Sequence, residues 1–279
     1  MTDLTVAQAL AEAKARGVGR LDAQLLLARA RSCSRSWLLA HDDAVLTPQQ
    51  AAGFRADMLR RADDEPLAYL LGEKEFHGLM LKVSADVLVP RPETELLVDW
   101  GLELLDGAQT GPAQPRVLDL GTGSGAIALA VKHARPNAQV SALDLRPAAL
   151  AVAGANADRL GLAIELLQGH WWGGVGDRRF HLVLSNPPYI RPDDPHLAAL
   201  RHEPRIALSP GGDGLDALRA IVAGAADHLE PGGWLLLEHG HDQAQPVQAM
   251  LNEQGFLEVQ TRSDLAGLPR CTGAHVQGR

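Results

Sequence analysis

The segment Arg116-Val117-Leu118-Asp119-Leu120-Gly121-Thr122-Gly123-Ser124-Gly125 is the part of the sequence that decides the fold. Its first half is a short apolar run, which is typical of a buried strand. The glycines that follow allow the backbone to take positive φ and to approach a ligand closely. Residues 126–134 then read as a helix. We therefore predict a strand, a tight turn and a helix, as at the start of a doubly wound sheet.

An acidic residue follows the next predicted strand, 140–143. This residue, Asp144, stands 19 positions after Gly125, where a carboxylate can accept hydrogen bonds from both hydroxyls of a ribose. A glycine turn with an acid at this spacing predicts a bound nucleoside. The glycines are at 121, 123 and 125, whereas a nicotinamide dinucleotide favours Gly-x-Gly-x-x-Gly. The tighter turn suits the adenosine of S-adenosylmethionine, which has no pyrophosphate to bind.

Strands and helices alternate through the rest of the chain, so we predict an α/β fold with a doubly wound, mostly parallel, seven-stranded sheet. The expected strands are 116–120, 140–143, 164–167, 180–184, 234–238, 256–259 and 271–276, and the expected helices are 96–105, 126–134, 147–160, 216–229 and 243–253.

The first part of the chain has a different pattern. Residues 3–75 indicate four or five short helices, including one after Thr47-Pro48, where an N-cap residue precedes a proline at the first helical position. We expect three regions: a helical bundle over 1–73 that docks a substrate, a β-hairpin linker over 74–90, and a catalytic domain over 91–279.

The second decisive segment is Asn186-Pro187-Pro188-Tyr189, directly after predicted strand 180–184. Proline lacks an N–H and fixes φ, so two prolines end the strand in a stiff corner. In an open parallel sheet ligands bind at this end of the strands. The Asn186 side-chain carbonyl and the Pro187 backbone carbonyl could accept both hydrogens of a planar NH2 group, with Tyr189 against the attached π-system. The alternative is a structural turn with a core tyrosine.

Charge argues against a nucleic-acid partner. The chain has a net charge of −8, and residues 76–279 carry 16 basic against 23 acidic side chains. Affinity for a polyanion comes largely from neutralising its phosphates, so this acidic half favours a protein substrate.

Little in the sequence indicates export, a membrane or a metal. The N-terminus lacks the pattern of a signal peptide, and apolar runs are too short to span a bilayer. The two cysteines, Cys33 and Cys271, suggest neither a disulfide framework nor a zinc site, and His239 and His241 lack a third ligand at metal-site spacing. We expect a cytoplasmic protein, a monomer, without a metal.

The sequence resembles the class I S-adenosylmethionine-dependent methyltransferases, and among them the peptide chain release factor glutamine N(5)-methyltransferases. The resemblance covers nearly the whole chain and includes the helical N-terminal region. It is carried by residues 75–76, 90–95 (Pro-Arg-Pro-Glu-Thr-Glu), 119–125, 186–189, Glu203-Pro204, Ala207-Leu208 and 238–240. Asn-Pro-Pro-Tyr also occurs in enzymes that methylate amino groups of DNA and RNA, whereas Pro-Arg-Pro-Glu-Thr and the helical domain favour the glutamine enzymes.

The resemblance implies roles for particular residues. S-adenosylmethionine is expected to bind Gly121, Thr122, Gly123, Ser124, Gly125, Asp144, Trp171 and Asn186, with Trp171 against the adenine. The glutamine amide is expected to be held by Asn186, Pro187, Pro188 and Tyr189, and catalysis is expected from Asn186, Pro187 and Tyr189. His170 departs from the family, since an acidic residue is expected before the tryptophan. Which of Trp171 and Trp172 meets the adenine stays open.

Several functions remain in competition. The first is methylation of the glutamine in the Gly-Gly-Gln motif of release factors, and a close variant modifies a ribosomal-protein glutamine. An adenine or guanine amino-methyltransferase is disfavoured by charge, and a nicotinamide oxidoreductase by glycine spacing and the Pro-Pro corner. A binding module without catalysis is disfavoured by the presence of both Asn186 and Asp144.

Overall fold

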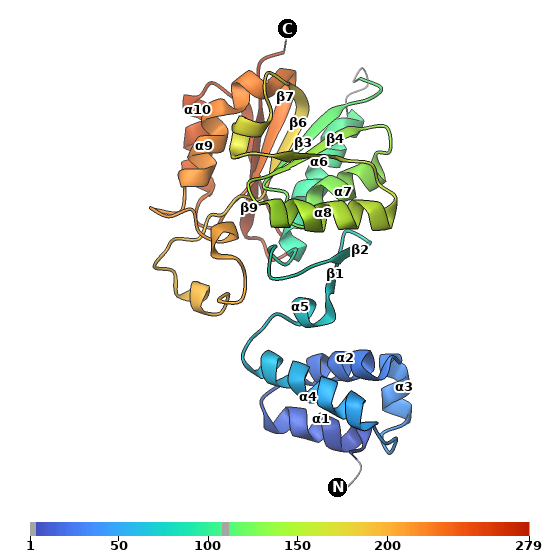
Figure 1. Cartoon of the computed structure of the whole chain (residues 1–279). Coiled ribbons are helices and arrows are strands. Elements are labelled where there is room, and N and C mark those ends of the chain that lie inside the picture. The colour runs from blue at the N-terminus through green and yellow to red at the C-terminus, as the bar shows by residue number, and fades with distance from the viewer. Residues whose placement is uncertain (1–3, 108–111, 279) are drawn as a thin grey trace. The chain divides into compact units, whose positions relative to one another are not determined.

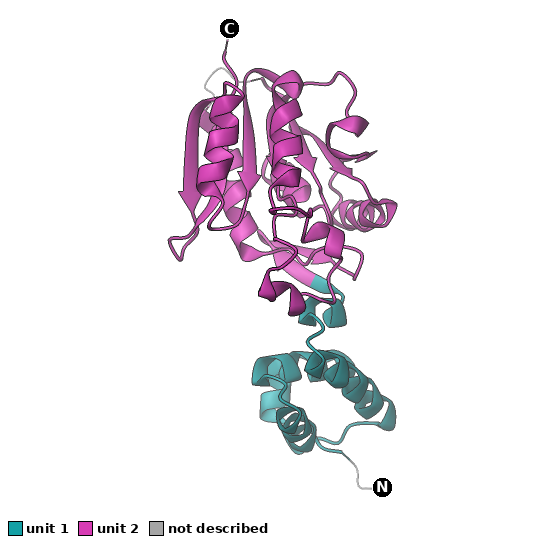
Figure 2. Ribbon diagram, turned by 90° about the vertical axis from the view of Figure 1, so that its left-hand side faces the viewer, with its two compact units in different colours: residues 1–73 teal, residues 74–279 magenta. Residues whose placement is uncertain are grey.

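The computed structural model describes residues 4–107 and 112–278 and divides the chain into two compact units. We call residues 1–73 the helical unit and residues 74–279 the sheet unit (Figure 2).

The helical unit contains α1 (Val6–Ala15), α2 (Arg20–Arg31), α3 (Arg35–Ala40), α4 (Pro48–Ala62) and α5 (Leu67–Leu71). Two of its helices begin with a capping box, in which the N-cap Thr side chain bonds the N3 backbone and the N3 Gln side chain bonds back. These pairs are Thr5 with Gln8 and Thr47 with Gln50. Its core is formed by buried aliphatic and aromatic side chains, among them Leu26, Leu27, Phe54 and Met58.

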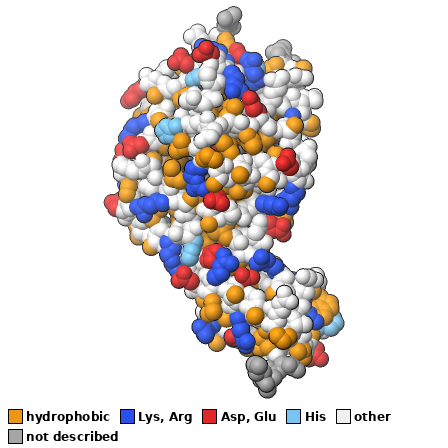
Figure 3. Space-filling model, viewed as in Figure 1, with side chains coloured by type: hydrophobic (Ala, Val, Ile, Leu, Met, Phe, Trp, Pro, Cys, Tyr) orange, Lys and Arg blue, Asp and Glu red, His pale blue; other side chains and the backbone are white. Residues whose placement is uncertain are grey.

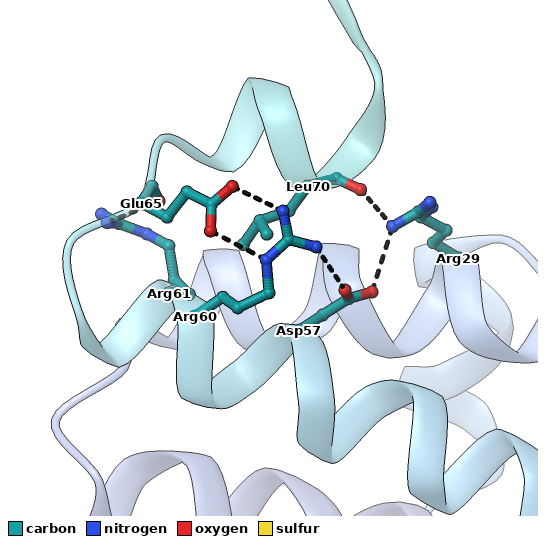
Figure 4. A network of polar contacts seen from close by, with 6 residues as sticks. All are labelled: Arg29, Asp57, Arg60, Arg61, Glu65 and Leu70. Atoms are coloured by element: carbon teal, nitrogen blue, oxygen red, sulfur yellow. Dashed lines mark hydrogen bonds and ion pairs between the residues drawn. The ribbon is translucent and has the colours of Figure 1, made fainter. Parts of the chain in front are cut away.

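Polar contacts join three helices of this unit (Figure 4). Asp57 of α4 lies 3.0 Å from Arg29 of α2 and 3.6 Å from Arg60, and Arg60 also bonds Glu65. Arg29 donates a second hydrogen bond to the carbonyl of Leu70 in α5. Because exposed ion pairs contribute little each, the apolar core supplies most of this unit's stability.

The hairpin of β1 (Glu73–Phe76) and β2 (Leu79–Lys82) belongs to the sheet unit except for its first residue, and it is followed by η1 (Pro92–Thr94). The remaining helices of the sheet unit are α6 (Glu95–Gly107), α7 (Ala126–Ala134), α8 (Pro147–Leu160), η2 (Trp171–Gly174), η3 (Pro195–Ala198), η4 (Arg205–Ala207), α9 (Asp216–Ala225), η5 (Ala226–His228) and α10 (Ala244–Glu253). The strands are β3 (Arg116–Leu120), β4 (Gln139–Asp144), β5 (Glu165–Gln168), β6 (Phe180–Ser185), β7 (Leu229–Glu238), β8 (Leu257–Ser263) and β9 (Pro269–His275).

In the described residues the main sheet has seven strands in the order β5-β4-β3-β6-β7-β9-β8. Neighbours from β5 to β7 are parallel, and β9 is antiparallel to both β7 and β8. Successive residues of a strand point to opposite faces of the sheet, so their side chains pack in two different hydrophobic cores. Val117, Leu182 and Leu236 pack with α6 and α7, whereas Leu118 and Leu235 pack with α9 and α10 (Figure 1). The predicted fold class is therefore confirmed.

Several element boundaries differ from the sequence-based expectation. The helix expected to reach residue 229 ends at Ala225, and β7 starts at Leu229 rather than at residue 234. The pairing Phe180–Leu229 is followed by Leu182–Trp234, so an irregularity absorbs the intervening Pro-Gly-Gly. Strand β8 continues to Ser263 because antiparallel pairing with β9 supports polar residues such as Thr261.

The helices of the described ranges include none with the length and apolar character needed to cross a membrane.

Candidate active site

The site lies where the strand order reverses. From β3 the chain proceeds outward through β4 to β5, and β6 then returns to pair with the opposite side of β3. Leu120 pairs with Ser185, so Gly121 and Asn186 follow neighbouring strand ends. Such a switch point is where open α/β sheets bind ligands.

A pocket of about 390 Å³ opens at this edge. Its lining includes Val87, Leu88, Gly121, Gly123, Asp144, Leu145, Arg146, His170, Trp171, Asn186, Pro188, Ile206, Ser209, Asp216 and Ala217.

The turn after β3 requires its glycines for different reasons. Gly121, Gly123 and Gly125 have φ of 76°, 54° and 84°, in the left-handed region that favours glycine. A Cβ on Gly125 would come within 3.2 Å of the Ala153 Cβ, so this glycine lets α7 start close to α8. Gly121 and Gly123 instead present backbone to the pocket.

Asp119 stabilises this turn from beneath. Its Oδ2 accepts hydrogen bonds from the Thr122 hydroxyl (2.6 Å) and from the Ala128 N–H (3.2 Å). Its Oδ1 is buried without a hydrogen-bond partner among the described residues. Burial raises the pKa of Asp119 to about 7, and the charge of Asp144 acts in the same direction.

The carboxylate of Asp144 is fixed by the backbone. Oδ2 accepts from the Gly123 N–H and Oδ1 from the Arg146 N–H, each at 2.9 Å. A carboxylate has about four lone-pair sites, so each oxygen keeps room for another donor. Asp144 is therefore oriented in the pocket wall before any ligand arrives.

The two adjacent tryptophans have different environments. Trp171 lines the pocket with an unusual positive φ of 49°. Trp172 turns to α9, where its Nε1 donates to the Ile221 carbonyl (3.0 Å) and its ring stacks on His228. The pocket therefore has an aromatic wall made by Trp171, beside which His170 also lies.

Asn186 reaches the pocket with its amide held from behind. Its Nδ2 donates to the Thr94 Oγ1 at 3.0 Å. On the neighbouring strand, Glu238 Oε1 accepts from the Tyr189 hydroxyl at 3.1 Å, and its Oε2 is buried without a hydrogen-bond partner among the described residues. Burial raises the pKa of Glu238 to about 7 despite the hydrogen bond from Tyr189, and burial likewise raises the pKa of Tyr189.

The Pro-Pro corner that follows Asn186 is held in place by contacts to the Tyr189 carbonyl. The Tyr189 carbonyl accepts from the Gln243 Nε2 at 3.0 Å. Gly214 approaches so closely that a Cβ there would lie 2.6 Å from the same oxygen. The segment before Thr94 is anchored separately, because buried Glu203 accepts from the Val89 N–H (3.0 Å) and pairs with Arg91.

The structure brings most of the expected site residues to one place, but with different roles. Gly121, Gly123, Asp144, Trp171, Asn186 and Pro188 line the pocket, whereas Thr122, Ser124, Gly125, Pro187 and Tyr189 are not among its lining residues. Thr122 bonds Asp119, and Tyr189 bonds Glu238.

Sequence reasoning missed several pocket residues. Arg146 and Ser209 have no distinctive pattern around them, and Ser209 is notable because its buried hydroxyl oxygen has no hydrogen-bond partner in the described part of the chain. Thr94 belongs to the Pro-Arg-Pro-Glu-Thr segment, which carried the family resemblance without indicating this contact.

Comparison with known proteins first defines the class. Residues 95–263 match the methyltransferase small domain, and residues 5–72 match the PrmC N-terminal domain. A methyltransferase from Pyrococcus furiosus superposes with a TM-score of 0.54 at 20% identity, covering 81% of this chain and 98% of that one. A 16S rRNA N2 G1207 methyltransferase from T. thermophilus gives a TM-score of 0.53 at 21% identity, covering 74% and 50%. The chain is thus a methyltransferase by fold and domain.

Closer relatives define the family. A release factor glutamine methyltransferase from Bordetella pertussis is 48% identical over 263 residues, covering 93% of this chain and 96% of that protein. One from Xylella fastidiosa is 46% identical over 273 residues, covering 97% and 98%. The chain belongs to the release factor glutamine methyltransferase family, as the sequence resemblance implied.

Proposed function

We propose that this protein transfers a methyl group from S-adenosylmethionine to the side-chain amide nitrogen of the glutamine in the Gly-Gly-Gln motif of peptide chain release factors. The observation that carries the proposal is the orientation of Asn186. Its NH2 group is bonded to Thr94, so its carbonyl oxygen is left for an external NH2 group. The names of the relatives support a release factor as substrate.

The pocket suits the proposed cofactor. The Asp144 carboxylate has acceptor sites for ribose hydroxyls, Trp171 gives an aromatic wall for adenine, and Gly121 allows close approach of backbone. The buried Ser209 hydroxyl lines the same pocket without a partner in the described ranges, as expected of a group that a ligand satisfies. When bound, S-adenosylmethionine supplies an electrophilic methyl group on a positively charged sulfur.

The chain's own contribution is to position and polarise the amide. A glutamine amide nitrogen is a poor nucleophile because its lone pair is delocalised into the carbonyl. Hydrogen bonds from its NH2 group to the carbonyls of Asn186 and Pro187 strengthen as positive charge develops on nitrogen. They stabilise the transition state more than the ground state. The methylated nitrogen would carry a positive charge and would therefore be acidic enough to lose its extra proton to water, so this scheme requires no side-chain general base.

The helical unit would dock the body of the substrate protein. We expect a chain that begins at residue 74 to lose kcat/KM for an intact release factor while keeping it for a short Gly-Gly-Gln peptide. Circular dichroism is the control that checks whether the truncated chain is folded. Equal losses on both substrates would contradict a docking role.

The competing substrates are separable in one assay. The protein is incubated with labelled S-adenosylmethionine and, in separate arms, with a release factor, ribosomal proteins and DNA, and the methylated residue is located by mass spectrometry. We expect label on the Gly-Gly-Gln glutamine alone. Label on a ribosomal-protein glutamine, or on DNA, would overturn the release-factor assignment.

The distribution of charged side chains on the surface makes methylation of DNA the least expected result of this assay. On the face in Figure 3, Lys and Arg side chains are interspersed with Asp and Glu. Phosphate binding favours a concentration of basic side chains, so we expect the enzyme to act on protein. Separately, we expect it to be a cytoplasmic monomer.

A further inference from the structure

Gln243 holds the Pro-Pro corner from a neighbouring loop. It is buried, with an exposure of 8%, and its side chain bonds two backbone groups. Oε1 accepts from the Gly240 N–H at 2.8 Å, and Nε2 donates to the Tyr189 carbonyl at 3.0 Å. A backbone N–H can only donate and a carbonyl can only accept, so these two partners fix which way the Gln243 amide faces.

The position of Gln243 in the sequence would favour a different use of its side chain. It is the N-cap residue of α10, whose first N–H groups have no partner inside the helix. Residues favoured here are Ser, Thr, Asp and Asn, because their side chains bond those N–H groups. The Gln243 side chain makes no such cap and bonds a residue 54 positions away. A residue that departs from a local rule in favour of a distant contact indicates a functional constraint.

The order of strands explains how this contact forms. β6 and β7 are parallel neighbours with Ser185 opposite Leu237, so the Pro-Pro corner and loop 239–243 begin at the same edge of the sheet. Gly214 leaves the room they need, since a Cβ there would lie 2.6 Å from the Tyr189 carbonyl oxygen and 3.1 Å from the Gln243 Nε2.

This hydrogen bond restrains the corner at its far end. The near end is fixed by Ser185, whose hydroxyl donates to the Leu120 carbonyl at 2.7 Å. Between the ends, the proline rings fix φ at two consecutive residues and the peptide bonds are planar, so few torsions are free. Holding the Tyr189 carbonyl therefore keeps the two oxygens that would meet the substrate amide at one spacing.

We propose that Gln243 is a positioning residue for methyl transfer, which acts through the Tyr189 carbonyl to hold Asn186 and Pro187 in the geometry that receives the glutamine amide. This inference rests on the proposed function. Gln243 is not among the residues that line the pocket, so it acts through the corner and not by contact with substrate or cofactor. Its loss should misplace the acceptors while leaving the cofactor wall at Asp144 and Trp171 intact.

The test variant is Gln243→Met, which keeps a side chain of similar length and removes both hydrogen bonds. Gln248→Met, in α10, is the matched control. It also loses a hydrogen bond, from Nε2 to the Thr261 hydroxyl of the edge strand β8 at 2.8 Å. Gln243→Asn is used if the Met variant does not fold. Asn is a favoured N-cap residue, but its side chain is one carbon shorter and cannot keep both bonds.

The first measurement is steady-state methylation of a Gly-Gly-Gln release factor, with turnover counted per S-adenosylmethionine site titrated by calorimetry, so that unfolded protein does not contribute. We expect kcat of either Gln243 variant to fall on the order of tenfold or more, as for misplaced reacting groups. KM for the release factor and Kd for S-adenosylmethionine should stay within about twofold, and Gln248→Met should keep its kcat. Wild-type kcat in the Gln243 variants, or an equal loss in Gln248→Met, would overturn the proposal.

The second measurement is one that a merely structural role would not change. Gln243→Met is made in wild type and in Asn186→Ala, and the two losses in kcat are compared. If Gln243 acts through the corner, its loss should be only a few-fold once the Asn186 oxygen is absent, because the two residues are coupled. Equal losses in both backgrounds would overturn the proposal.

The proposal and the function on which it rests fail in different ways. A wild-type protein that does not methylate the release-factor glutamine would defeat the proposed function, and the positioning role with it. A wild-type protein that methylates this glutamine, with a Gln243→Met variant that does so equally fast, would defeat the positioning role alone.

Discussion

At the scale of single residues, the proposed chemistry depends on the direction of one uncharged side chain, that of Asn186. Pro187 and Pro188 restrict the backbone around Asn186, and Thr94 restricts its amide. A group already held in its working orientation loses little entropy when the substrate binds. This explains how a poor nucleophile could be used without a strong base.

Asn186→Ala removes the proposed acceptor for the substrate amide. We expect kcat to fall about 10²- to 10³-fold, as when one donor or acceptor to a developing charge is lost, with the Kd for S-adenosylmethionine changed only a few-fold. Methylation kinetics and calorimetry measure the two effects. Asn137→Ala, at an exposed position, is the control. Near-normal turnover in the Asn186 variant would refute the clamp.

Asp144→Ala removes the carboxylate that the Gly123 and Arg146 N–H groups hold in the pocket wall. We expect the Kd for S-adenosylmethionine to rise at least tenfold, because charge-assisted hydrogen bonds contribute about 1.5–3 kcal/mol each. Isothermal titration calorimetry gives the constant. The exposed Asp227→Ala should bind as wild type does. Unchanged affinity in the Asp144 variant would remove the ribose assignment.

At the scale of elements, the sheet is covered tightly on both faces. Gly273 in β9 shows this most clearly, since a Cβ there would lie 2.3 Å from Leu236 and 2.8 Å from Trp100 of α6. Trp100 is buried to 1% exposure, so neither it nor Leu236 has free space to enter. Close packing of this kind holds the strand ends, and with them the site, at fixed spacing.

Gly273→Ala should therefore destabilise the sheet unit by about 1–3 kcal/mol through overpacking. Chemical denaturation followed by circular dichroism gives the free energy of unfolding. Gly53→Ala, in α4, is the comparison, because its Cβ would meet nothing within 4 Å and alanine favours helix by roughly 0.5–1 kcal/mol. A Gly273 variant as stable as wild type would show that the α6 contact can relax.

At the scale of the whole molecule, buried acids make stability depend on pH. Burial raises the pKa of Asp119 to about 7 from an ordinary 3.8. The folded protein therefore holds this proton more tightly than the unfolded chain does. Below pH 3.8 both states are protonated and the group costs nothing, and the cost grows as pH rises through 7.

Asp119→Asn removes this titration. Between pH 5 and pH 8 we expect the unfolding free energy of wild type to lose on the order of 2–3 kcal/mol more than that of the variant. Urea denaturation across that pH range measures both curves. Parallel curves would mean that Asp119 is ionised at low pH in the folded protein. Glu238, whose pKa burial also raises to about 7, contributes in the same direction to both proteins.

Much of the site could be predicted because its signals are local. The glycine turn at 121–125, the acid after β4 and the Pro-Pro corner after β6 each depend on the conformational limits of a few consecutive residues. Trp171 was assigned by resemblance, and the structure places it in the pocket wall. Ser209 and Arg146 reach the same pocket through loops whose residues have no comparable constraint.

The sequence by itself determined the alternation of strands and helices, the helical unit, and which segments end at the carboxyl edge of the sheet. Hydrophobic periodicity and backbone stereochemistry are properties of neighbouring residues, so they can be read without a fold. Only the tertiary structure decided that the Asn186 amide lies against the Thr94 hydroxyl, 92 positions away in the sequence. That contact depends on strand order and on the docking of α6, which are set by many contacts between residues far apart in the sequence.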